Sequence, residues 1–138
     1  MKSYDNFFLP IDNMDAAKDF YGKTLGLKLK FDFSEIGMTA FSVGTEEAAI
    51  ILKDKHKFPD AKPVIWFVVD DVAKSYKELK RIGLTFLSEP YKIRTGNAVE
   101  FEDPFGNRLG ITDYKKGHKK PALNQQNELL SIFSPTCF

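Results

Sequence analysis

Cysteine and histidine are nearly absent from this chain of 138 residues, which contains one cysteine and two histidines. A single cysteine, Cys137, cannot form a disulfide within the chain, so we expect a reducing, cytoplasmic location. Cys137 also has no neighbouring base that would make it a nucleophile. The histidines, His56 and His118, lie in polar segments outside the expected strands, so we expect both to be exposed and neither to bind a metal.

A strong charge of one sign and long apolar runs are also lacking. The 20 basic and 19 acidic residues leave a net charge of +1, which gives no strong field to attract nucleic acid or an acidic membrane. No apolar run has the length of a membrane span, and the N-terminus lacks the apolar core of a signal peptide. The 43% hydrophobic and 28% charged residues are typical of a folded domain. We therefore expect one domain with no nucleic-acid or membrane partner.

Two segments of the chain follow one pattern. In each, an apolar run leads to a pair of helix-capping residues, Asp12-Asn13 and Asp70-Asp71, and an amphipathic stretch then ends at a glycine, Gly26 and Gly83. Three short strand-like runs follow each stretch. The pattern predicts one β-α-β-β-β unit written twice. Because neither unit has enough sheet to cover its own apolar face, we expect the two units to pair.

The repeat sets the expected boundaries within a single domain of residues 1–114. The first unit covers about residues 4–53, a polar connector covers 54–62, and the second unit covers about 63–114. The strands expected after the two helices are 28–33, 39–43 and 48–52, then 84–87, 98–102 and 108–112. Residues 115–138 match neither unit and form a C-terminal tail, which either frays or packs as an appendage, or folds into a short helix that binds a partner.

The segment Asp103-Pro104-Phe105-Gly106-Asn107 predicts a tight turn between the last two strands, because proline fixes φ, glycine permits a positive φ, and Asp and Asn can bridge the bend. This turn, the two β-α-β-β-β units, and the segment Asp15-Ala16-Ala17-Lys18-Asp19-Phe20-Tyr21 before Leu25-Gly26-Leu27 resemble the vicinal oxygen chelate superfamily. That superfamily includes glyoxalase I, extradiol dioxygenases, methylmalonyl-CoA epimerase and the bleomycin-resistance proteins.

The resemblance covers about residues 4–114 and implies an α+β fold in which the paired units form half-open curled sheets around a ligand cavity. Members are usually dimers, so a homodimer is expected. In metal-dependent members, ligands lie on the first and last strands of each unit, and the corresponding positions here hold Asn6, Ile51, Val64 and Gly110. None of these supplies the imidazole, carboxylate or thiolate that a divalent ion prefers. We therefore expect neither a metal nor another cofactor.

Strand alternation predicts which side chains share the face of these four positions. The expected ligand-binding residues combine aromatic walls with carboxylates and one guanidinium: Asn6, Phe8, Trp66, Glu100, Glu102, Arg108 and Thr112. Glu100 and Glu102 are either solvated charges, or one of them is partly desolvated, with a raised pKa, and acts as a general base or pairs with a cationic ligand. Trp66 either packs within the wall or stacks on a ligand.

Three functions remain open. The first is a metal-free protein of bleomycin-resistance character that binds a small, planar or aromatic molecule in an apolar groove. The second is an enzyme of the lyase, isomerase or dioxygenase type that uses an unrecognised metal site or acid–base catalysis by Glu100 or Glu102. The third is a non-catalytic dimer whose tail docks a partner. The sequence does not decide whether the chain catalyses a reaction.

Overall fold

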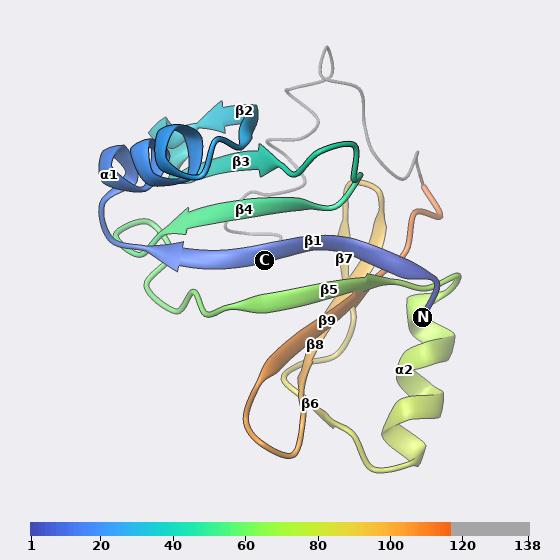
Figure 1. Cartoon of the computed structure of the whole chain (residues 1–138). Helices are drawn as coiled ribbons and strands as arrows, with labels where there is room; N and C mark the ends of the chain where they lie inside the picture. The colour runs from blue at the N-terminus through green and yellow to red at the C-terminus, as the bar shows by residue number, and fades with distance from the viewer. Residues whose placement is uncertain (117–138) are drawn as a thin grey trace. The chain divides into compact units, whose positions relative to one another are not determined.

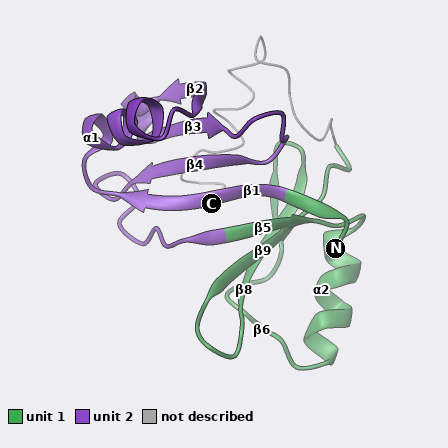
Figure 2. Ribbon diagram, viewed as in Figure 1, with its two compact units in different colours: residues 1–4, 65–138 green, residues 5–64 purple. Residues whose placement is uncertain are grey.

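The computed structural model describes residues 1–116, whose elements are shown in Figure 1. The described residues divide into two compact units: unit 2 is Asp5–Val64, and unit 1 combines Met1–Tyr4 with residues 65–116 (Figure 2). His118, Cys137 and all but the start of the expected tail lie outside the described residues. Within residues 1–116, no helix is long and apolar enough to cross a membrane.

Unit 2 contains the first β-α-β-β-β pattern, with its strands in the order β2-β3-β4-β1. β1 runs parallel to β4, and the other neighbouring strands are antiparallel. The elements are β1 (Ser3–Ile11), α1 (Met14–Asp19), the π-helical turn η1 (Phe20–Thr24), β2 (Lys28–Phe33), the 3-10 turn η2 (Ser34–Ile36), β3 (Met38–Ser42) and β4 (Ala49–Asp54). The expected strands of this unit are therefore present in the expected order.

The helix of unit 2 begins as expected and widens near its end. Asn13 caps it, because the Asn13 side-chain oxygen accepts a hydrogen bond of 3.0 Å from the Ala16 N–H. The sequence predicts one continuous helix up to the glycine, but the last turn is π-helical, and the Leu25 N–H bonds to the Phe20 carbonyl, five residues back. The segment still ends at Gly26, whose φ of +71° favours glycine.

Unit 1 contains the second pattern, with strands in the order β5-β9-β8-β6 and with β7 paired to β8. Its elements are β5 (Val64–Val68), α2 (Val72–Arg81), β6 (Thr85–Phe86), β7 (Tyr91–Ile93), β8 (Gly96–Glu102) and β9 (Arg108–Thr112). Val64 at the start of β5 is assigned to unit 2, and Ser3 and Tyr4 at the start of β1 are assigned to unit 1. Two details differ from the sequence prediction: the strand expected at 84–87 is only Thr85–Phe86, and β7 was not predicted. β7 is too short to show alternation, and it forms because β8 begins early enough to pair with it.

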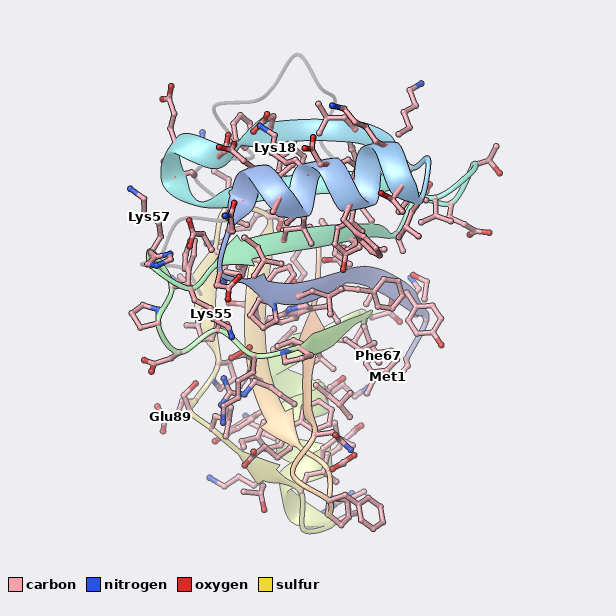
Figure 3. The ribbon with its side chains drawn as sticks, turned by 60° about the vertical axis from the view of Figure 1, so that its left-hand side comes forward. Met1, Lys18, Lys55, Lys57, Phe67 and Glu89 are labelled. Carbon is pink, nitrogen blue, oxygen red and sulfur yellow. The ribbon has the colours of Figure 1, made fainter. Side chains whose placement is uncertain are left out.

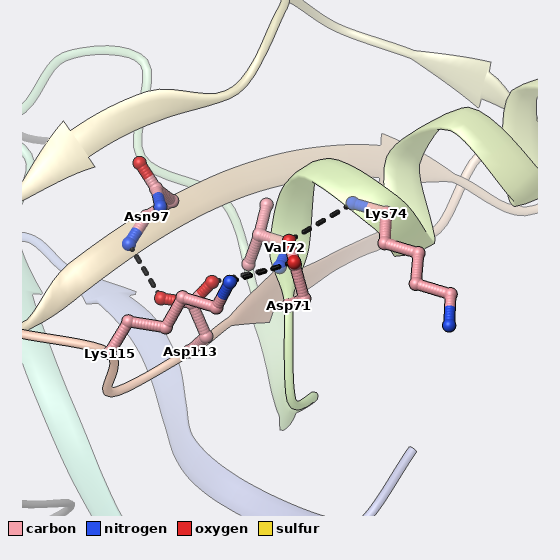
Figure 4. Close-up of polar contacts among 6 residues, drawn as sticks. All are labelled: Asp71, Val72, Lys74, Asn97, Asp113 and Lys115. Atoms are coloured by element: carbon pink, nitrogen blue, oxygen red, sulfur yellow. Dashed lines mark hydrogen bonds and ion pairs between the residues drawn. The ribbon is translucent and has the colours of Figure 1, made fainter.

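A buried carboxylate accepts a hydrogen bond from the first residue of α2 (Figure 4). Asp113 is fully buried, and its two oxygens accept hydrogen bonds from the N–H groups of Val72, at 2.8 Å, and Asn97, at 2.9 Å. No side chain fits at Gly96, because a Cβ there would collide with Asp113. Asp71 caps the same helix by accepting from the Lys74 N–H at 3.1 Å. Asp113 thus connects the helix to the β7–β8 hairpin.

The apolar cluster of unit 1 lies between α2 and the sheet. It contains Val72 of α2 and the strand residues Phe101 and Ile111, and Leu109 packs against it. Strand alternation therefore places the neighbouring residues of β8 and β9 on the opposite face. The sequence prediction that Phe101, Leu109 and Ile111 form the core face is confirmed.

Unit 2 has the same division of faces. Met14 of α1, Phe41 and Leu52 form its apolar cluster, with Leu9 and Ile11 of β1 packed against them. The ion pair between Lys18 Nζ and Asp32 Oδ2, at 2.8 Å, also connects α1 to β2. Figure 3 labels Lys18 on the helix. The alternate residues of β1 and β4 consequently occupy the face opposite α1.

Candidate functional site

The face of the unit 1 sheet opposite α2 contains a row of polar side chains across three strands. Thr85 of β6 is in register with Glu102 of β8, and Glu102 is in register with Arg108 of β9. We call these three residues the polar row. Glu102 and Arg108 are half-buried, so water only partly screens their charges.

Arg108 has an unsatisfied donor. Its Nε is buried and has no hydrogen-bond partner within the part of the chain that the structure describes. A buried donor without an acceptor costs about 1–3 kcal/mol. A bound molecule that presents an oxygen to this Nε would remove that cost.

The next row on the same face is occupied by Trp66. Glu100 is in register with Gly110, and a Cβ added to Gly110 would lie 2.6 Å from the Trp66 ring atom Cζ3. The indole therefore lies directly against the Gly110 backbone, where only glycine leaves room for it. Trp66 is 1% exposed, and in this position its ring is packed as part of the wall.

Thr112, the remaining predicted site residue of unit 1, has a structural contact. It is 3% exposed, and its hydroxyl donates to the Asn97 carbonyl oxygen at 3.1 Å. Trp66, Glu100, Glu102 and Arg108 thus share one face of this sheet, and the charged members are its partly accessible groups. The structure places Thr112 at the end of this face, beside the Asp113 anchor.

Asn6 and Phe8, the predicted site residues of unit 2, are buried on the face opposite α1. The Asn6 side-chain oxygen accepts from the Ala49 N–H at 3.1 Å and so joins β1 to β4. The sequence analysis did not identify Lys53, which is 6% exposed and has its Nζ 4.9 Å from the Phe8 ring centre and 4.3 Å from that of Phe58. Its alternation with Ile51 on β4 was the signal that could have placed it on this face.

A surface pocket of about 520 Å³ adjoins the end of the polar row. Its lining is mainly apolar and includes two residues of the row: Ile82, Gly83, Leu84, Thr85, Phe101, Glu102, Asp103 and Pro104. The Asp103 carboxylate is engaged in the predicted turn, where Oδ1 accepts from the N–H groups of Phe105 and Asn107, each at 2.8 Å. Hydrogen bonds from the side chain and backbone of Asn107 lower the pKa of Asp103. Of the two carboxylates that line the pocket, Asp103 is held by the turn and Glu102 takes no part in these hydrogen bonds.

The family resemblance assigns metal ligands to four positions of this chain, and the residues present at these positions are poor ligands for a divalent ion. Ile51 and Val64 have no donor atom, Gly110 has no side chain, and the Asn6 oxygen already accepts a backbone hydrogen bond. No cluster of three His, Cys, Asp or Glu side chains suited to a metal occurs among residues 1–116. His56 has an exposed side chain, as expected, and its Nδ1 lies 2.9 Å from Asp54 Oδ1.

Comparison with known proteins identifies sequence relatives. The profile described as "Glyoxalase/Bleomycin resistance protein/Dioxygenase superfamily" matches residues 3–111. The uncharacterized protein YurT of Bacillus subtilis is 29% identical over 116 aligned residues, which cover 73% of this chain and 91% of that protein.

Solved structures share the fold at low sequence identity. A hypothetical protein from Bacillus halodurans C-125 superposes with a TM-score of 0.64 at 18% identity, covering 85% of this chain and 97% of that one. Methylmalonyl-CoA epimerase from Mycobacterium tuberculosis gives 0.61 at 17% identity, with 91% of each chain covered. A superfamily member from Vibrio splendidus 12B01 gives 0.61 at 14% identity, covering 78% of this chain and 95% of that one. At these identities the similarity shows the α+β fold.

Proposed function

The chain belongs to the glyoxalase/bleomycin resistance protein/dioxygenase superfamily, and from this premise we propose that it binds a small organic molecule without a metal ion. The observation that carries the proposal is the contact between Trp66 and Gly110. The indole occupies the space into which a side chain at position 110 would project, and the family resemblance assigns a metal ligand to this position. A divalent ion cannot replace the indole without unpacking a 1% exposed tryptophan.

The location of the small-molecule site follows from the accessible groups of the same face. Half-buried Glu102 lines a pocket with mainly apolar walls. Glu100 and Arg108, which are also half-buried, share the sheet face of Glu102. Ligand pockets typically combine apolar walls with a few oriented polar groups and enclose about 300–1,000 Å³. The pocket volume of about 520 Å³ lies within that range.

Acid–base catalysis on this face is the second candidate. It is favoured by the position of Glu102, a carboxylate that is half-buried and lines the pocket. A carboxylate in such a position can take a proton from a bound molecule. Conversion of a bound compound, lost in the Glu102→Gln variant, would select this candidate over simple binding. The homodimer and the partner-docking tail remain predictions.

Two titrations of the full chain test metal independence. Trp66 is the only tryptophan, so its fluorescence reports on the surroundings of Gly110. We expect Zn²⁺, Mn²⁺ and Ni²⁺ to leave this emission unchanged. We expect the planar cation proflavine or the aromatic anion 8-anilinonaphthalene-1-sulfonate to bind equally well with and without EDTA. Stoichiometric metal binding that alters Trp66 emission, or dye binding that EDTA abolishes, would contradict metal independence.

A further inference from the structure

We infer that the polar row of unit 1 selects a zwitterionic ligand. The ligand's carboxylate oxygen accepts from Arg108, its ammonium group donates to Glu102, and its apolar part occupies the adjoining pocket. The inference rests on the proposed function and names the class of molecule that this site takes.

Arg108 is a hydrogen-bond donor, so the ligand must carry an acceptor that reaches it. Its guanidinium remains charged in proteins and forms its strongest hydrogen bonds with carboxylates. Its Nε is buried and has no hydrogen-bond partner within residues 1–116, although Glu102 lies directly opposite on β8. A ligand oxygen that reaches the Arg108 Nε from this face of the sheet satisfies the donor.

Glu102 is a hydrogen-bond acceptor, so the ligand must carry a donor that reaches it. It is half-buried and lines the pocket of about 520 Å³. Side chains directly opposite on antiparallel strands have their Cβ atoms about 4.5–5.5 Å apart. The two side chains therefore leave the same face of the sheet next to each other, and one small molecule with an ammonium and a carboxylate on the same or neighbouring carbon atoms can reach both.

The opposite charges of Arg108 and Glu102 disfavour binding of a ligand that carries a single charge. An anion that reaches Arg108 also meets the negative charges of Glu102 and Glu100, which follow one another on the same face of β8. A cation that reaches Glu102 meets the guanidinium and leaves the Arg108 Nε unsatisfied. Only a molecule that carries both charges is complementary to the row.

The apolar walls determine the rest of the ligand. Ile82, Leu84 and Pro104 line the pocket next to Glu102 and Thr85. An apolar group attached to the charged end of the ligand would bury its surface against these side chains. The expected ligand is therefore a small zwitterion with a hydrophobic or aromatic substituent.

Three probes with the same ring test the charge requirement: L-phenylalanine, 2-phenylethylamine and 3-phenylpropionate. Their dissociation constants are measured by NMR titration of the isotope-labelled full chain, which also follows the Arg108 Nε–H signal. We expect phenylalanine to bind at least about tenfold more tightly than either ion, because each charge-assisted hydrogen bond contributes more than a neutral one. The Arg108 Nε–H signal should shift with phenylalanine and not with phenylethylamine.

Variants assign the two charges. Arg108→Gln should reduce phenylalanine binding to the level of phenylethylamine, and Glu102→Gln should reduce it to the level of phenylpropionate. Arg81→Gln, an exposed arginine on α2, is the matched control and should bind like the unchanged chain. Arg108→Gln should not lower the melting temperature, since it removes an unsatisfied buried donor. This stability readout separates a loss of recognition from a loss of folding.

The outcomes distinguish the inference from the proposed function. If the three probes bind equally, or if Arg108→Gln leaves the preference unchanged, selection of a zwitterion is overturned while small-molecule binding stands. If none binds at about 20 mM, where even fragments of millimolar affinity would register, the ligand class is overturned. The proposed function is then judged by the metal and dye titrations alone.

Discussion

The sheet faces of the two units differ although one pattern builds both. In unit 2, the face opposite α1 contains closely packed side chains, of which Phe8, Ile51 and Met38 are at most 4% exposed. In unit 1, the corresponding face contains the half-buried charges Glu102 and Arg108. One copy of the unit therefore has a closely packed, buried face and the other has a half-buried charged face beside a pocket, and for this reason we propose the ligand site in unit 1.

The difference extends to how each unit accommodates a buried charge. In unit 2, the Lys53 ammonium lies over two phenylalanine rings, which stabilise it through cation–π interactions. In unit 1, the buried Nε of Arg108 has no acceptor among the residues that the structure describes. Proteins accept such a cost at functional sites, where stability and binding oppose each other.

Removing the aromatic side chain at the equivalent position of each unit should have the largest effect. Phe8 of β1 and Trp66 of β5 are 4% and 1% exposed, and truncating a buried aromatic ring to alanine costs about 3–5 kcal/mol. We expect both Phe8→Ala and Trp66→Ala to lower the free energy of unfolding by amounts in this range, measured by urea denaturation.

Phe105→Ala is the control for this pair. Phe105 is 86% exposed, so its removal should change the free energy of unfolding by less than about 0.5 kcal/mol. A loss below about 1 kcal/mol for Trp66→Ala would show that the indole does not seal the Gly110 position, and the comparison of the two faces would fail.

The next largest effect concerns the side chains that accept hydrogen bonds from the first turns of α2 and α1. α2 depends on Asp113, whose removal leaves the buried Val72 N–H and the partly buried Asn97 N–H without this acceptor, whereas α1 has the exposed cap Asn13. Asp113→Ala should cost about 3 kcal/mol and Asn13→Ala about 1 kcal/mol. Chemical denaturation of both variants measures this difference, and equal losses would refute a special role for Asp113.

Local sequence patterns predict much of this fold. Caps at Asn13 and Asp71, glycine ends at Gly26 and Gly83, and the alternation of apolar residues on the strands all act over a few residues. They gave both β-α-β-β-β units, and alternation placed Phe101 on the face that packs against α2.

The parts that were missed depend on contacts between distant residues. Asp113 binds the N–H of Val72, 41 positions away, and nothing in its local sequence indicates that partner. Trp66 was predicted on the correct face of its strand, but its packing on Gly110 arises only when β5 and β9 lie side by side. β7 forms only because β8 extends far enough to pair with it.

The smallest expected effect is a loss of stability of unit 2 at acidic pH. Burial alone would raise the pKa of Asp32, but hydrogen bonds from Lys18 and Ser34 outweigh it and lower the pKa from 3.8 to about 2. A carboxyl whose pKa is lower in the folded state adds stability above its unfolded pKa and loses it as the pH falls from about 4 to about 2. Because the pair is about one-third exposed, this contribution is at most about 1 kcal/mol.

Lys18→Ala isolates that ion pair. The variant should lose up to about 1 kcal/mol at pH 7 and clearly less at pH 2, where Asp32 of the unchanged folded chain is partly protonated and its ion pair with Lys18 is weaker. Urea denaturation at the two pH values measures this change. The Lys115–Asp71 ion pair of unit 1 does not involve Lys18. Its contribution to stability should therefore depend on pH in the same way in the Lys18→Ala variant as in the unchanged chain. An equal loss at both pH values would mean that Lys18 stabilises α1 through packing of its aliphatic chain and not through its charge.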